Sequence, residues 1–164
     1  METRLKTAIV YTSKYGTTEK VAASIAEKLK ETSEVELFSL KKCLNPDISG
    51  FDTVIIGTPI YAGQASQKIK TFCDTNQTAL LQKETGLFVC GMEPNNEKRT
   101  QELKDAYPEV LLQKAKAASF LGGAFIFEKM NFFERMIIKK IAKTTTSVEQ
   151  IEWKTVDEFV NKLQ

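Results

Sequence analysis

The sequence predicts an α/β domain in which a parallel sheet is covered by helices on both faces. Apolar, β-branched runs over 5–12, 52–58 and 86–91 lack the polar alternation of half-exposed strands, which is typical of strands buried on both faces. Amphipathic stretches alternate with these runs, as they do in parallel sheets with crossover helices. The length of 164 residues suits one core, so we expect a single domain over 1–164.

The first half of the chain places helices and turns between the early strands. A helix over 17–31 carries one apolar stripe, made of Val21, Ala22, Ile25, Ala26 and Leu29. A short strand over 35–40 follows, and Asn45-Pro46-Asp47 marks a loop over 41–50. Ser66 is expected to cap a helix whose inward residues are Ile69, Phe72 and Cys73.

The second half of the chain continues the same alternation. A helix is expected over 96–107, and Pro108 interrupts it to begin a further turn. The segment 116–127 contains the fifth strand, with Gly122-Gly123 at its end. A second amphipathic stretch covers 129–143. The last helix is expected to start at the capping box Thr155 to Glu158, with an apolar face made of Val156, Phe159, Val160 and Leu163.

Five strands separated by helices fit the doubly wound order 2-1-3-4-5. In such sheets ligands bind at the carboxyl ends of the strands, where the strand order reverses. Here the order reverses between the first and third strands. The loop 12–18 is therefore expected beside 58–64, with 91–96 as a third wall.

The loop Thr12-Ser13-Lys14-Tyr15-Gly16-Thr17-Thr18 has the composition of an anion site. Backbone N–H groups at a helix start have no intrahelical partner, and the helix dipole favours a negative charge there. Hydroxyl groups add donors, and a glycine allows close approach of the backbone. The alternative is an ordinary capped helix with Thr17 or Thr18 as the N-cap. The loop lacks a P-loop lysine and a G-x-G-x-x-G pattern, so it predicts a phosphate other than that of ATP or GTP.

The composition excludes several kinds of chemistry. There is no histidine, so the commonest general base and metal ligand are absent, and we expect no metal site. We interpret the three widely spaced cysteines, Cys43, Cys73 and Cys90, as buried free thiols. A net charge of +2 does not favour nucleic acid as a partner. With no signal peptide and no apolar run near the roughly 18 residues of a membrane span, a cytoplasmic location is expected.

Two segments at the expected switch point resemble the flavodoxin superfamily. Tyr11 to Ala22 is similar to the FMN-phosphate loop and its following helix, and Ile55 to Gly63 is similar to the third strand and the loop that meets the flavin ring. Within the superfamily the chain resembles the flavodoxin-domain group that includes the menaquinone-dependent protoporphyrinogen dehydrogenases. That resemblance rests on Lys98-Arg99-Thr100, Gly122-Gly123-Ala124, Asn131 to Ile141 and Val148 to Phe159. It implies a flavodoxin-like doubly wound sheet of five parallel strands.

The resemblance also implies FMN as the cofactor. The residues around its phosphate would be Thr12, Ser13, Lys14, Tyr15, Gly16, Thr17 and Thr18, although Lys14 facing solvent is an equal alternative. The residues around the flavin ring would be Thr58, Pro59, Ile60, Tyr61, Ala62, Gly63, Gly91, Met92 and Glu93. Tyr61 is expected to stack on the ring, the alternative being a tyrosine that covers the sheet edge. No catalytic side chain is required, because the flavin itself carries the chemistry.

The charges near the expected ring site bear on the activity. Residues 58–66 carry no charge, whereas electron-carrier flavodoxins surround the ring with acidic residues. The uncharged segment favours an oxidoreductase that exchanges two electrons with a quinone or an organic substrate. The resemblance implies that this oxidoreductase depends on FMN, with protoporphyrinogen, in heme biosynthesis, as a candidate substrate. The alternative is a non-enzymatic flavodoxin that shuttles electrons between redox proteins. A flavodoxin fold that has lost FMN and serves as a binding module is a third interpretation.

The segment 129–143 is basic as well as amphipathic. It combines apolar residues with five cations and one acidic residue, Glu134. Such a helix can lie on an anionic membrane surface near a quinone pool, which would make the protein peripheral at the inner face of the membrane. The alternative is an ordinary helix that covers the sheet with a basic solvent face. The sequence also leaves room for a homo-oligomer.

Overall fold

The computed structural model describes residues 4–125, 134–136 and 148–164, and its centre is a twisted, mostly parallel sheet. The order of the parallel strands along the sheet is β2-β1-β3-β5-β6. These strands are β2 (Ser33–Ser39), β1 (Leu5–Tyr11), β3 (Thr53–Tyr61), β5 (Glu84–Cys90) and β6 (Ala117–Phe120). The predicted order 2-1-3-4-5 is confirmed, because β5 and β6 are the fourth and fifth parallel strands in the chain.

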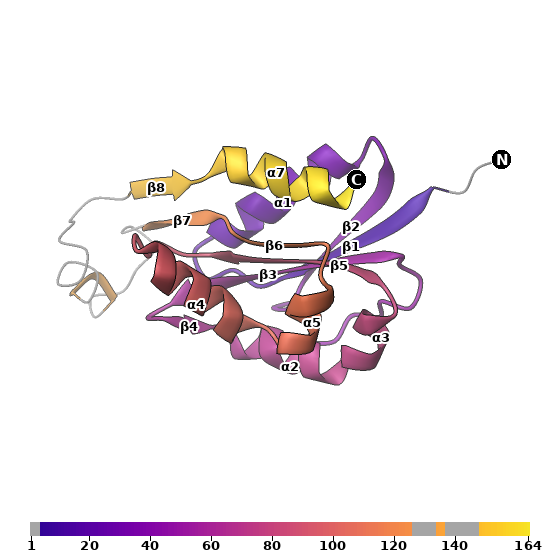
Figure 1. Cartoon of the computed structure of the whole chain (residues 1–164), viewed down its shortest axis with the longest axis horizontal. Helices are drawn as coiled ribbons and strands as arrows, with labels where there is room; N and C mark the ends of the chain where they lie inside the picture. Colours follow the sequence, from indigo (N-terminus) through magenta and orange to yellow (C-terminus); the bar gives the residue numbers. More distant parts are fainter. Residues whose placement is uncertain (1–3, 126–133, 137–147) are drawn as a thin grey trace.

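Helices cover both faces of the sheet, as predicted (Figure 1). The helices α1 (Thr17–Leu29) and α7 (Trp153–Leu163) pack on one face. The other face is covered by α2 (Gln67–Thr75), α3 (Gln77–Leu81), α4 (Asn96–Ala106) and α5 (Glu109–Lys114). Each face contributes its own buried apolar cluster, one around Ile9 and Phe159 and the other around Ile56 and Phe72. Fully buried strand residues on both faces explain the absence of polar alternation in the sequence.

Two glycines in the central strands make room for buried side chains. A Cβ built on Gly57 of β3 would lie 2.1 Å from the ring of Phe88. A Cβ on Gly86 of β5 would lie 2.9 Å from the side chain of Leu163 in α7. Side chains at these two positions would displace buried neighbours, so Gly57 makes room for the Phe88 ring of β5, and Gly86 allows α7 to pack directly against the sheet.

The fifth parallel strand leaves the sheet at the glycine pair that the sequence marked. The strand β6 ends at Phe120, and after Leu121 the chain forms β7 (Gly122–Phe125), which pairs antiparallel with β8 (Val148–Ile151). Gly122 has a φ of 77°, a conformation that disfavours side chains, and it redirects the chain at this point. The small sheet formed by β7 and β8 was not predicted, because its two strands are far apart in the sequence.

Three sequence predictions need correction or fall outside the described residues. The capping box at Thr155 is wrong: α7 begins at Trp153, and its N-cap Glu152 makes no side-chain cap hydrogen bond. Ser66 does precede α2, but without a side-chain cap hydrogen bond. Of the stretch 129–143, only residues 134–136 are described, and they are helical.

The cysteine prediction is confirmed for two of the three thiols. All three cysteines are free, and Cys73 and Cys90 are buried, whereas Cys43 is exposed. Cys43 lies in the loop between β2 and β3. Burial raises the pKa of Cys73 to about 12, so this thiol stays protonated in the folded protein.

Candidate functional site

The loop between β1 and α1 lies at the switch point of the sheet, since β1 has β2 on one side and β3 on the other. Helix α1 begins at Thr17, and its N-cap is Gly16 in a left-handed conformation with a φ of 96°. No side chain caps the helix, so the alternative in which Thr17 or Thr18 is the N-cap is wrong. The first N–H groups of α1 are therefore left for a group outside the helix.

The hydroxyl groups of this loop fall into two sets. Ser13 accepts a hydrogen bond from the Gly16 N–H at 2.9 Å, which closes the loop. The hydroxyls of Thr12 and Thr17 have no hydrogen-bond partner in the described part of the chain, although Thr12 is only 6% exposed. Hydroxyls this close to a helix start, with no other partner, are available donors for an anion.

Thr18 belongs to the interior rather than to the rim of the loop. Its side chain is 1% exposed, and its hydroxyl has no oxygen or nitrogen partner among the residues that the structure describes. The hydroxyl lies near the Cys90 thiol at the end of β5. Burial raises the pKa of Cys90 to about 12, and Thr18 partly offsets that effect. The structure thus places Thr18 between α1 and the sheet.

The segment 58–64, which we call the second loop of the site, is partly a strand. The strand β3 continues to Tyr61, turns through Ala62 and Gly63, and returns as β4 (Gln64–Ala65). Both turn residues have positive φ, 51° at Ala62 and 76° at Gly63, as a tight two-residue hairpin requires. The prediction that this strand ends at Thr58 is wrong for Pro59 to Tyr61, because the apolar and aromatic residues there extend the strand.

The Thr58 hydroxyl joins the two ends of this hairpin by hydrogen bonds. Its hydroxyl accepts a hydrogen bond from the Ser66 N–H at 3.0 Å and donates one to the Pro59 carbonyl at 3.0 Å. The side chain is fully buried, so these bonds lie in a low-dielectric environment. Pro59, Ile60 and Tyr61 are half-buried, whereas the turn Ala62-Gly63 is exposed. The hairpin therefore presents an uncharged edge at the carboxyl end of the sheet.

The loop after β5, residues 91–95, is the third loop of the site, and it packs closely on the hairpin and on β7. The Gly91 N–H donates to the Gly122 carbonyl at 2.9 Å, and a Cβ on Gly123 would lie 2.7 Å from the Gly91 carbonyl oxygen. A Cβ on Gly91 would in turn lie 3.3 Å from Ile60. Met92 and Glu93 follow and are half-buried. The absence of side chains at these glycines brings the second and third loops into contact.

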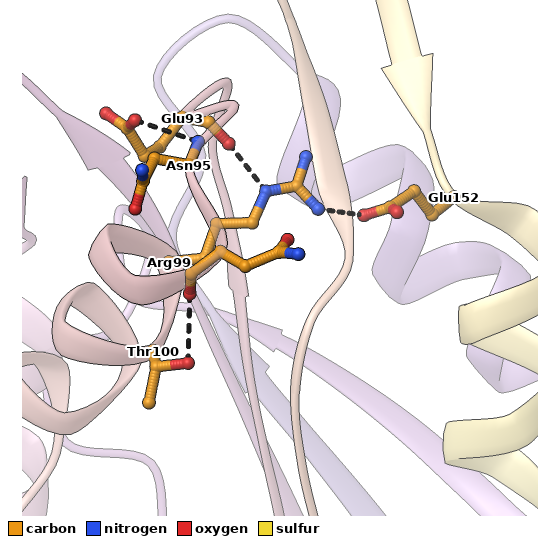
Figure 2. A network of polar contacts seen from close by, with 6 residues as sticks. Glu93, Asn95, Arg99, Thr100 and Glu152 are labelled. Carbon is orange, nitrogen blue, oxygen red and sulfur yellow. Dashed lines mark hydrogen bonds and ion pairs between the residues drawn. The ribbon is translucent and has the colours of Figure 1, made fainter.

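Arg99 holds the third loop in place, as Figure 2 shows. Its Nε donates to the Glu93 carbonyl at 2.5 Å, and its guanidinium pairs with Glu152 at 2.8 Å. The guanidinium also lies 4.6 Å from the centroid of the Phe120 ring. The Glu93 carboxylate accepts from the Asn95 N–H at 3.1 Å. Sequence reasoning assigned no role to Arg99, because its partners lie in three different segments.

Lys14 joins the first loop to the hairpin and to residue 134. Its Nζ lies 2.8 Å from the Glu134 carboxylate and 3.4 Å from the centroid of the Tyr61 ring. The Tyr15 ring is farther away, at 5.4 Å. The prediction that Lys14 either contacts a phosphate or faces solvent did not include this arrangement. Glu134 was missed as a site residue; its signal was its place as the single acidic residue among the cations of 129–143.

The predicted site residues therefore do meet at one edge of the sheet. A hydroxyl-lined helix start, an uncharged hairpin and a glycine-containing loop converge at the carboxyl ends of β1, β3 and β5. The strand order, the two layers of helices and this edge define a flavodoxin-like α/β protein. The chain belongs to the flavodoxin domain family, whose model matches residues 8–151.

Curated and solved relatives agree with this family. The chain is 22% identical over 171 aligned positions to the protoporphyrinogen IX dehydrogenase [quinone] of Escherichia coli strain K12, covering 97% of this chain and 94% of that protein. The crystal structure of oxidised flavodoxin 1 from Bacillus cereus matches with a TM-score of 0.57 and 16% identity, over 96% of this chain and 95% of the other. The flavodoxin of Streptococcus pneumoniae TIGR4 matches with a TM-score of 0.58 and 19% identity, over 96% of each chain. These structural likenesses show a shared fold.

Within residues 4–125, 134–136 and 148–164, no helix has the length and apolar character needed to cross a membrane.

Proposed function

We propose that the chain binds FMN at this edge of the sheet. The observation that carries the proposal is the start of α1 at the switch of strand order, where the helix has no side-chain cap and the hydroxyls of Thr12 and Thr17 have no partner among the described residues. A phosphate satisfies these donors and is favoured by the helix dipole. The neighbouring hairpin is uncharged and ends in an aromatic residue, which suits a flat, mostly apolar ring.

Each loop has its own part in this proposal. Thr12, Ser13, Gly16 and Thr17 hold the phosphate, with Tyr15 beside them. Tyr61 stacks on the flavin ring, Pro59 to Gly63 border it, and Gly91 to Glu93 approach it from the other side. Thr18 and Thr58 pack behind these loops and do not contact the FMN, because their side chains are buried. The Thr18 hydroxyl faces Cys90, and the Thr58 hydroxyl bonds the Ser66 N–H. The bound FMN supplies the capacity to accept and release two electrons, and the protein tunes this capacity through nearby dipoles and charges.

We further propose a two-electron oxidoreductase that acts on a quinone or an organic substrate. Residues 58–66 bring no charge to the ring, so this hairpin does not oppose the negative charge that reduction adds. The Escherichia coli relative is named for a protoporphyrinogen substrate and a quinone, and its similarity extends over almost the whole chain. Protoporphyrinogen with menaquinone is therefore the first substrate pair to test.

The experiment follows the visible spectrum of the purified protein loaded with FMN. Anaerobic addition of protoporphyrinogen IX should bleach the flavin bands, and menaquinone should restore them over repeated turnovers. Free FMN at the same concentration is the control for non-enzymatic reaction. A protein that binds FMN but exchanges no electrons with either compound would contradict the enzymatic proposal while leaving the cofactor proposal intact.

The second candidate function is a flavodoxin that carries electrons between redox proteins. The acidic residues Glu93 and Glu97 near the third loop favour it, because carriers dock through charged rims. A carrier would show a strongly negative potential for its second electron and no turnover with quinones. An anaerobic redox titration of the FMN-loaded protein separates the two candidates, since the oxidoreductase is expected to take both electrons at similar potentials.

We also propose peripheral contact with an anionic membrane through 129–143. The support is the sequence of that segment, in which Lys129, Arg135, Lys139, Lys140 and Lys143 accompany a set of large apolar residues. The protein should sediment with vesicles that contain anionic lipid and stay in solution with neutral vesicles at the same salt concentration. Equal sedimentation with both kinds of vesicle, or with neither, would contradict the proposal.

A further inference from the structure

Lys14 and Glu134 form an ion pair directly beside the proposed ring site. The Lys14 Nζ lies 2.8 Å from the Glu134 carboxylate, and the Glu134 side chain is only 13% exposed. The same Nζ lies 3.4 Å from the centroid of Tyr61. Partial burial of the carboxylate weakens the screening by salt that makes most surface ion pairs ineffective. Both charges can therefore act on a neighbouring group.

The position of Lys14 ties its charge to whatever stacks on Tyr61. The Lys14 ammonium covers one face of the Tyr61 ring, so a stacked ring takes the other face. Stacked aromatic rings have centroids roughly 4.5–7 Å apart, which puts that ring within about 10 Å of the ammonium. At that distance in a partly desolvated site, a unit charge still has an appreciable electrostatic effect. Two electrons and one proton taken up by a flavin leave one additional negative charge on it. A cation nearby stabilises that charge, and an anion nearby opposes it.

We propose that Lys14 and Glu134 act as opposed charges that set the reduction potential of the bound flavin. This inference rests on the proposed function, in which the site holds FMN and Tyr61 stacks on it. Lys14 stabilises the reduced, negatively charged form, and Glu134 offsets that effect from the other side of the ion pair. The reduction potential of the flavin is thereby set by an ion pair between the loop 12–18 and residue 134, while the hairpin 58–66 itself carries no charge.

The test measures the two-electron midpoint potential of FMN in Lys14→Gln, Glu134→Gln and the double variant. Lys14→Gln removes the positive charge, so the midpoint potential should fall; Glu134→Gln removes the negative charge, so the midpoint potential should rise. Each shift is expected to reach at least tenfold in the reduction equilibrium, which is about 30 mV for a two-electron couple. The double variant should return close to the wild-type potential.

The opposite signs distinguish a charge effect from a structural one. Both single variants break the same contact, so loosening of the site would move the two potentials in one direction. Lys28→Gln is the matched control, because Lys28 also pairs with a carboxylate, Asp157 at 2.7 Å, but lies in the last turn of α1, at the end opposite the phosphate loop. In Lys28→Gln the midpoint potential of FMN should shift by less than corresponds to a threefold change in the reduction equilibrium.

Several outcomes would overturn the inference without touching the proposed function. Shifts of the same sign in the two single variants, or shifts no larger than that of Lys28→Gln, mean that the pair does not tune the flavin. If Lys14→Gln does not retain FMN, Glu134→Gln decides alone, and an unchanged or lowered potential overturns the inference. By contrast, a wild-type protein that binds no FMN would refute the proposed function itself.

Discussion

Among single residues, adjacent Thr17 and Thr18 have different environments. Thr17 is half-buried at the start of α1, and its hydroxyl has no partner in the described part of the chain, whereas Thr18 is buried against the sheet beside Cys90. One position along a helix rotates a side chain by about a quarter-turn, so only one of two adjacent residues faces the loop. The sequence alone cannot tell which, because both are threonines and the helix start has to be known to within one residue.

This difference gives a matched pair of substitutions. Thr17→Val removes a hydrogen bond to a charged phosphate, worth roughly 1.5–3 kcal/mol, and should weaken FMN binding about 10- to 100-fold. Thr18→Val should change the affinity by less than about threefold, since the two side chains have the same shape and no phosphate bond is lost. Fluorescence quenching of FMN titrated with apoprotein measures both. Equal losses in the two variants would place the phosphate elsewhere.

Ala62 is the one described non-glycine residue with positive φ, at 51° in the hairpin turn. Left-handed backbone costs an L-residue with a Cβ roughly 1–2 kcal/mol, and asparagine tolerates it better than alanine. Ala62→Asn should therefore raise the free energy of unfolding by about 0.5–1 kcal/mol, whereas Ala62→Val should lower it by about 1 kcal/mol or more. Urea denaturation of the apoprotein provides the comparison. A stabilising valine would show that the turn does not hold this conformation.

At the scale of elements, Arg99 connects α4 with the loop after β5 and with the start of α7 (Figure 2). Arg99→Met should lower the free energy of unfolding by roughly 1 kcal/mol, after discounting the half-exposed Glu152 contact. Because the Glu93 carbonyl loses its donor, FMN affinity should fall as well. Lys98→Met is the control, since it removes the same charge from the exposed neighbouring position. If Lys98→Met lowered the free energy of unfolding and the FMN affinity as much as Arg99→Met, the loss would reflect a general effect of charge.

Tyr107 joins two strands of the sheet to the chain after α4. Its buried hydroxyl lies 2.6 Å from the Phe88 carbonyl and 2.9 Å from the Ile56 carbonyl, so one proton serves β5 and β3. Tyr107→Phe should lower the free energy of unfolding by about 1–2 kcal/mol near neutral pH. Tyr61→Phe is the control, because no described group bonds its hydroxyl, and it should stay within about 0.5 kcal/mol.

The effect of Tyr107 also has a defined pH dependence. Burial raises the pKa of Tyr107 well above its ordinary value of 10.0. Above about pH 10 the unfolded chain releases this proton while the folded protein keeps it, so the unfolded state binds fewer protons and stability falls. The difference between wild type and Tyr107→Phe should therefore shrink as the pH rises past 10. A constant difference up to pH 11 would show that the hydroxyl titrates equally in both states.

The strands and most helices could be predicted because local patterns determine them. Continuous apolar runs identified the three central strands β1, β3 and β5, and Pro108 correctly separated α4 from α5. The failures share a physical cause, which is pairing between distant segments. The pairing of β7 with β8 depends on contacts that no local pattern encodes, and the extension of β3 into a hairpin depends on a short partner strand. Helix α7 begins at Trp153 without the expected cap, which propensity at Thr155 could not reveal.

At the scale of the whole molecule, the position of the site was predicted from the strand order of the sheet. The strand order confirmed at the switch point brings together loops that the sequence could only list separately. What it could not supply were contacts from outside these loops, namely Glu134 on Lys14 and Glu152 on Arg99. Charged side chains are long and find partners through tertiary packing, so their pairing is decided by the assembled fold.

The central claim is that the start of α1 holds the phosphate of FMN. The most direct measurement compares FMN with riboflavin, which has the same ring and no phosphate, in calorimetric titrations of the apoprotein. We predict one FMN per chain, bound at least about 100-fold more tightly than riboflavin, since several charge-assisted hydrogen bonds depend on the phosphate. Equal affinities for the two compounds, or no binding of FMN, would contradict the claim.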